Sequence, residues 1–95
     1  MREELVEIYS DATNAAIMRH PGRRFPGMLI QGDSLSRIAN SIDYALRHAV
    51  PGSENEEELR ALSEEMHGRL RFYAEVLTEH GLPLPFETLP EHLKR

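Results

Sequence analysis

The stretch His20–Leu46, HPGRRFPGMLIQGDSLSRIANSIDYAL, decides the fold that the sequence predicts. It holds a proline-glycine loop with two arginines, a short apolar segment, a Gly-Asp break and an amphipathic helical pattern. Pro-Gly dipeptides are strong turn signals, and the residue before a proline favours extended geometry. The stretch therefore predicts a turn, a strand and a helix in close succession.

Three short apolar segments predict a small antiparallel sheet. Leu5–Tyr9 is rich in branched and aromatic residues and is followed at once by turn residues, which favours a strand. The end of an N-terminal helix is the alternative for this segment. Ala15–Met18 and Gly27–Gln31 flank the Pro-Gly loop, and we expect them to pair as antiparallel neighbours.

An amphipathic helix is predicted over Ser34–Ala49. Asp33 is a good N-cap residue, with Ser34 as the competing candidate. Apolar residues recur at helical spacing along one stripe, and a Pro-Gly pair stops the pattern. Because three of the seven stripe residues are alanine, we expect the helix to pack closely on the sheet. The stripe consists of Leu35, Ile38, Ala39, Ile42, Ala45, Leu46 and Ala49.

A second helix is predicted over about Glu54–His80, with a length of about 40 Å. Ser53 and Glu56 form an S-x-x-E capping box at its start, and Gly81 fits the C-terminal cap. Gly68, near the middle, indicates a bend or a close contact. A helix this long would project its acidic start or pair with another copy of the chain.

Length and composition predict a single domain with a modest core. The chain has 95 residues, of which 40% are hydrophobic and 28% are charged. The predicted fold is α+β, with an antiparallel sheet of about three strands packed by one helix. The expected order is a β-meander over 1–32, helices over 33–50 and 53–81, and an extended tail over 82–95, in which Leu82, Leu84 and Phe86 contact the body.

The absence of cysteine and of long apolar runs narrows the class of protein. Without cysteine, a disulfide scaffold, a thiolate zinc site and a cysteine nucleophile are excluded. No apolar run has the length of a signal peptide core or of a membrane span, so a cytoplasmic location and no membrane partner are expected.

Acidic residues concentrate at the start of the second predicted helix. Residues 54–65 hold six acids and one arginine, and the rest of the chain is balanced, so this block accounts for the whole net charge of −5. Acids at a helix N-terminus interact favourably with the helix dipole. They also form an electrostatic surface for a basic partner. The six are Glu54, Glu56, Glu57, Glu58, Glu64 and Glu65.

The loop around Arg23 and Arg24 is the one basic cluster. With Arg19 and Phe25 it could contact phosphates and stack on a base, but nucleic acid is an unlikely partner for an acidic chain. The loop could instead contribute an arginine hot spot to a protein interface. Pairing of the arginines with nearby acids is the structural alternative.

Motifs for catalysis or metal binding are weak in this sequence. Glu64 and His67 form an E-x-x-H pair, but a di-iron site needs a second such helix and two further glutamates. The chain has no phosphate-binding G-x-x-x-x-G-K-[ST] run and no G-x-S-x-G elbow. We therefore predict no enzyme activity, no metal and no cofactor.

Two segments resemble the core of HicB-type antitoxins: Phe25–Gly27 and Gln31–Leu35, followed by Ala39 and the Ala45-Leu46 pair. The resemblance implies a small sheet with a helix on one face, in a protein that neutralises a small ribonuclease toxin by binding it. A fourth strand and a C-terminal DNA-binding domain are not recognisable, so operator binding is not implied. The PGRRFPG and QGDSL motifs are also similar to those of small uncharacterised bacterial proteins.

These observations together predict a non-catalytic binding protein of antitoxin or immunity type. Its expected partner is a basic, toxin-like protein bound by the six glutamates, with Arg23 and Arg24 as further contact residues. A small regulatory or structural homodimer is the first alternative. A weak RNA-binding protein that uses the arginine loop is the second.

Overall fold

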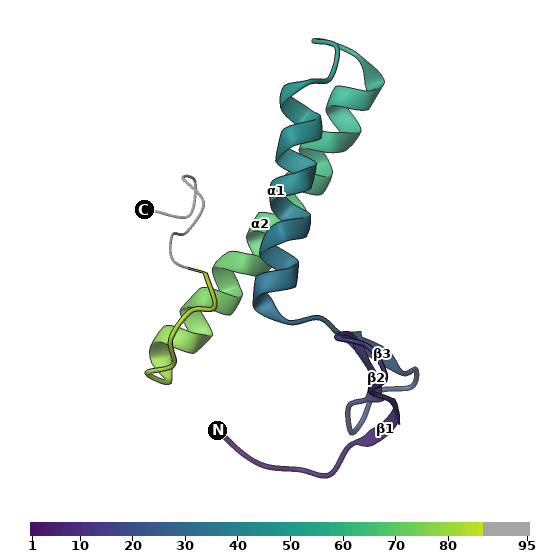
Figure 1. The fold of residues 1–95 in the computed structure, drawn as a ribbon, viewed down its shortest axis with the longest axis vertical. Coiled ribbons are helices and arrows are strands. Elements are labelled where there is room, and N and C mark those ends of the chain that lie inside the picture. Colours follow the sequence, from purple (N-terminus) through teal and green to yellow (C-terminus); the bar gives the residue numbers. More distant parts are fainter. Residues whose placement is uncertain (87–95) are drawn as a thin grey trace. The chain divides into compact units, whose positions relative to one another are not determined.

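A computed structural model describes residues 1–86 and shows an α+β fold. The chain divides into two compact units, and the second begins at Gly32. The first unit is the predicted three-stranded antiparallel sheet, and the second is built on the two helices (Figure 1). The elements are β1 (Glu7–Ser10), β2 (Ala16–Arg19), β3 (Gly27–Leu29), α1 (Gly32–Arg47) and α2 (Glu54–Glu79).

The sheet has the order β1-β2-β3, so β2 is its central strand. Ile8 pairs with Met18, and the register shifts at a bulge before Ser10. The loop between β2 and β3 begins with a tight turn in which the Arg23 amide donates to the His20 carbonyl at 3.1 Å. Gly22 has a φ of 82°, which is the left-handed conformation that a type II turn requires at this position.

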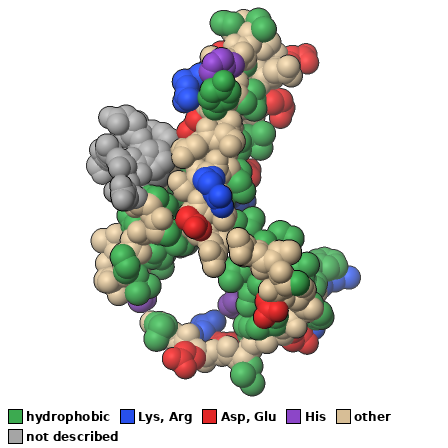
Figure 2. Space-filling view, viewed as in Figure 1, with side chains coloured by type: hydrophobic (Ala, Val, Ile, Leu, Met, Phe, Trp, Pro, Cys, Tyr) green, Lys and Arg blue, Asp and Glu red, His purple; other side chains and the backbone are tan. Residues whose placement is uncertain are grey.

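The sheet unit has no buried side chain. Every residue from 1 to 31 is exposed or half-buried. Ile8 is 60% exposed and Met28 is 59% exposed, although both lie in strands. Figure 2 shows hydrophobic side chains open to solvent over this unit. The sheet therefore presents apolar surface that its own residues do not cover.

The helical unit contains the buried core. Ala39 of α1 and Leu70 of α2 are fully buried, and three partly buried residues pack against them: Leu35, Met66 and Phe86. The alanine-bearing face of α1, which was expected to pack on the sheet, packs on α2 within this unit. The predicted contact of Phe86 with the body is confirmed. The rest of the predicted tail, residues 87–95, lies outside the described residues.

The start of α1 differs slightly from the prediction. The helix begins at Gly32, two residues before the predicted start, and the carboxylate of Asp33 accepts a hydrogen bond from the Ser34 amide at 2.8 Å. It ends at Arg47, two residues early, and i→i+3 hydrogen bonds from His48 and Ala49 close the last turn.

Both predicted caps of α2 are present. The Ser53 hydroxyl accepts a hydrogen bond from the Glu56 amide at 3.1 Å. At the other end Gly81 has a φ of 68°, and the amides of Gly81 and Leu82 donate to the carbonyls of Thr78 and Leu77. This pair of bonds is a Schellman motif. Neither helix of the described chain is long and apolar enough to cross a membrane.

Two glycines have opposite surroundings. A Cβ built on Gly32 would lie 2.4 Å from the Tyr73 hydroxyl, so the aromatic ring packs directly on the backbone at the start of α1. A Cβ on Gly68 would meet nothing within 4 Å. The close contact considered for Gly68 is therefore not present in the described structure.

Candidate functional site

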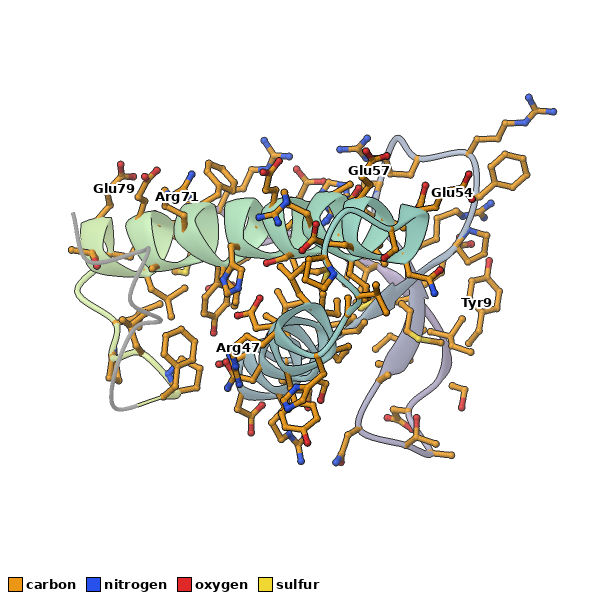
Figure 3. The ribbon with its side chains drawn as sticks, turned by 90° about the horizontal axis from the view of Figure 1, so that it is seen from above. Tyr9, Arg47, Glu54, Glu57, Arg71 and Glu79 are labelled. Carbon is orange, nitrogen blue, oxygen red and sulfur yellow. The ribbon has the colours of Figure 1, made fainter. Side chains whose placement is uncertain are left out.

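The outer face of α2, the side turned away from α1, carries most of the predicted acidic surface. Glu54, Glu57 and Glu58 are exposed, as are Glu64 and Glu65 two turns later. An α-helix turns by about 100° per residue, so these positions share one broad face. In Figure 3, Glu54 and Glu57 project from this side, together with Arg71 and Glu79.

Glu56 lies off the outer face, unlike the other five glutamates of the block. Its side chain is 25% exposed and accepts a hydrogen bond from the Gly52 amide at 3.0 Å. It also lies 3.7 Å from the Arg60 guanidinium. The carboxylate of Glu56 therefore belongs to the helix cap, in agreement with its place in the predicted S-x-x-E capping box.

Most carboxylates of the outer face form no ion pair with another described residue. Glu65 forms an i,i+4 pair with Arg69 at 3.6 Å. Within residues 1–86, no ion pair involves Glu54, Glu57, Glu58 or Glu64. Negative charge is thus uncompensated along the first three turns of the face, where it favours a cationic partner.

An exposed aromatic residue, Phe72, lies on the same face. It follows Glu54 by 18 residues, which is five full turns, and its side chain is 67% exposed. Gly68, one turn earlier, leaves open space beside it. Phe72 was not among the residues predicted to form a site, although its place five turns after Glu54 put it on the face of the acidic residues.

A polar network joins the two helices in the interior. Asp43 of α1 accepts hydrogen bonds from Ser63 Oγ and His67 Nε2, both at 2.7 Å. His67 is 3% exposed. Asp43 is not part of the apolar stripe predicted for the first helix, yet its carboxylate points toward α2.

The geometry of this network is that of a structural connection. In a nucleophilic triad the histidine bonds directly to the serine hydroxyl. Here Ser63 and His67 each bond to Asp43. Glu64 of the predicted E-x-x-H pair is exposed while His67 is buried, and no group of metal-ligating side chains is present in the described chain.

The arginine loop borders a groove on the sheet unit. Arg23 and Arg24 are exposed and form no ion pair within residues 1–86. The Arg24 guanidinium lies 5.2 Å from the centre of the Phe25 ring. The groove has a volume of about 620 Å³, and Val6, Met18 and Leu29 contribute to its apolar floor.

Arg19, the third arginine considered for this site, is already paired. Its guanidinium contacts the Glu7 carboxylate across the β1–β2 pair. The hydrogen bond to Glu7, followed by the charge of the same carboxylate, raises the pKa of Arg19 above its ordinary value. Arg23 and Arg24 are therefore the cations of the loop that remain available to a partner.

Comparison with known proteins places the chain in a family. Residues 1–86 match the family of unknown function DUF6959. The chain belongs to this family. The match covers both the sheet unit and the two helices, so DUF6959 describes the architecture as a whole. No curated protein and no solved structure matches the chain, and the resemblance to HicB-type antitoxins stays a prediction.

Proposed function

We propose that this protein is a non-catalytic binding module of antitoxin or immunity type that neutralises a basic partner protein. The binding surface is the outer face of α2. The observation that carries the proposal is the row of exposed carboxylates at Glu54, Glu57, Glu58 and Glu64, which have no ion pair within residues 1–86. We place this activity in the cytoplasm.

Electrostatics supports a cationic partner. Like charges on successive turns of one helix repel each other, and a basic surface that covers them relieves this repulsion. A field of one sign also accelerates encounter with an oppositely charged partner. Rapid capture is useful for a protein that must block a toxic partner before it acts.

Phe72 supplies the apolar contact that charge alone does not. Aromatic residues in the centre of an interface often contribute much of its binding free energy. Phe72 is 67% exposed on the same face as the carboxylates, so one partner surface can cover both. An acidic face with one aromatic anchor fits a partner that combines basic residues with an apolar pocket.

The test uses the product of the gene adjacent to this one, co-expressed and purified. Its dissociation constant is measured by calorimetry for the wild-type chain and for a Glu54→Lys, Glu57→Lys, Glu58→Lys variant. We expect the triple variant to weaken binding by at least about tenfold, and the loss to shrink at high salt. Phe72→Ala is expected to weaken binding by a similar factor.

A matched control changes the same charge elsewhere. Glu3, Glu4 and Asp11 are exposed residues of the sheet unit, and their conversion to lysine alters the net charge equally. This control is expected to keep the dissociation constant within about twofold of wild type. Failure of the adjacent product to bind, or equal losses in the two triple variants, would contradict the proposal.

A further inference from the structure

The groove of the sheet unit lies on one face of the sheet. Residues paired across antiparallel strands point to the same side, and positions two apart along a strand do so too. Ile8, Met18, Ala16 and Leu29 therefore share a face. The groove lies along it, with Arg23 and Arg24 among its lining residues.

The apolar face of the sheet is not buried by residues of its own unit. A small sheet gains much of its stability in water from its hydrophobic face, and burial of that face adds to it. No side chain of residues 1–31 is buried, so the sheet unit does not supply that burial from its own residues. The exposed floor is also large enough to accept several side chains, given its volume of about 620 Å³.

The residues that line the groove determine which chemical groups an occupant needs. The floor is apolar, and the two arginines lack an acidic partner within residues 1–86. Covering them with an uncharged surface would remove two cations from water without compensation, which is unfavourable. A suitable occupant therefore combines apolar side chains with carboxylates.

The outer face of α2 has this combination. Leu62 is 44% exposed and lies one turn from Glu58 and Glu65, and Glu64 follows two residues later. We infer that the groove of one copy receives the outer face of α2 from a second copy, with Arg23 and Arg24 against the unpaired glutamates. Each copy offers one groove and one helix, so two reciprocal contacts close a two-fold dimer.

The inference rests on the proposed function, because it assigns a second occupant to the same acidic face. The arginine loop of the second copy and the basic partner then compete for that face. Self-association would keep the acidic surface covered until the partner displaces it. The arginine loop thereby becomes a built-in competitor of the partner.

The experiment combines two complementary charge reversals, with the oligomeric state measured by sedimentation velocity. One variant carries Arg23→Glu and Arg24→Glu, and the other carries Glu57→Arg and Glu58→Arg. Wild type is expected to dimerise at low salt, with a dimer dissociation constant that rises at least about tenfold in each variant alone. An equimolar mixture of the two variants is expected to restore the dimer, because both of its reciprocal contacts again join opposite charges.

A control variant, Arg37→Glu with Arg47→Glu, reverses two exposed arginines of α1 and is expected to dimerise like wild type. Circular dichroism checks that every variant keeps its helix content. A monomeric wild type overturns the inference. So does a dimer that survives both reversals, which indicates a different interface, or a mixture that stays monomeric, which shows that the two sets of charges do not face each other.

The same variants separate this inference from the proposed function. Arg23→Glu with Arg24→Glu removes the competing loop, so the apparent affinity of this variant for the basic partner is expected to be independent of the concentration of the chain, whereas that of wild type falls as the chain dimerises. Dimerisation without partner binding contradicts only the proposed function. Partner binding by a chain that never dimerises contradicts only the inference.

Discussion

The helical unit and the sheet unit of this chain differ in how much side-chain surface they bury. The helical unit buries Ala39 and Leu70 completely and joins its helices through Asp43, Ser63 and His67. The sheet unit buries no side chain. The two helices therefore stabilise each other through a buried core, whereas the sheet leaves apolar side chains exposed to solvent.

The largest expected loss of stability comes from truncating a core side chain of the helical unit. Leu70→Ala removes the largest fully buried side chain of the described core and is expected to lower the free energy of unfolding by about 2–5 kcal/mol. Met28→Ala, in the exposed sheet, is expected to change it by less than about 1 kcal/mol. Urea denaturation followed by circular dichroism measures the free energy of unfolding of both variants. Equal losses of stability would contradict the difference in burial between the two units.

A smaller effect is expected from overfilling the helical unit. Gly32→Ala places a methyl group against the Tyr73 ring and is expected to cost about 1–3 kcal/mol of stability. Adding Tyr73→Ala opens the space, so the double variant is expected to lose less than the sum of the single losses. Gly27→Ala in the sheet unit, where a Cβ meets nothing within 4 Å, is the control. Strictly additive losses would show that the two residues do not touch.

Single hydrogen bonds of the network between α1 and α2 are expected to have a still smaller effect on stability. Ser63→Ala removes one donor to Asp43 and is expected to reduce the free energy of unfolding by about 1 kcal/mol. Ser41→Ala, on the exposed side of α1, is expected to change it by less than about 0.5 kcal/mol. Thermal unfolding of the two variants side by side decides whether the network stabilises the pair.

The smallest expected change in the free energy of unfolding is a gain in stability. Gly68→Ala is expected to stabilise the helical unit by about 0.5–1 kcal/mol, because alanine favours the helix and the added methyl group meets no neighbour. Gly81→Ala is expected to destabilise it, since its φ of 68° strains any residue with a Cβ. A loss of stability in the Gly68 variant would reveal a close neighbour at that position.

Local signals made the helices predictable from sequence. Ser53 and Gly81 terminate α2 through hydrogen bonds to residues within five positions, so the pattern of neighbours contains the whole interaction. The Pro-Gly turn before β3 is equally local. The strands were placed within a few residues for the same reason.

Interactions between distant residues were not predictable in the same way. The apolar stripe on α1 predicted that one face of this helix is buried. Alanines on that face can pack equally well against a sheet or against a second helix, and in the structure they pack on α2. Asp43 and His67 meet across 24 positions, and no spacing rule connects them. At the acidic site, five of the six glutamates are exposed, and Glu56, which the S-x-x-E pattern also assigned to the cap, accepts a hydrogen bond from the Gly52 amide.

The packing of Tyr73 on Gly32 also limits how the gene can change in length. An inserted residue inside α1 would rotate everything before it by about 100° and carry Gly32 away from the ring. An insertion in the turn between Arg47 and Glu54 leaves both helices in phase with themselves. Length variants that evolution tolerates are therefore expected in that turn, while in-frame insertions within α1 are expected to be eliminated.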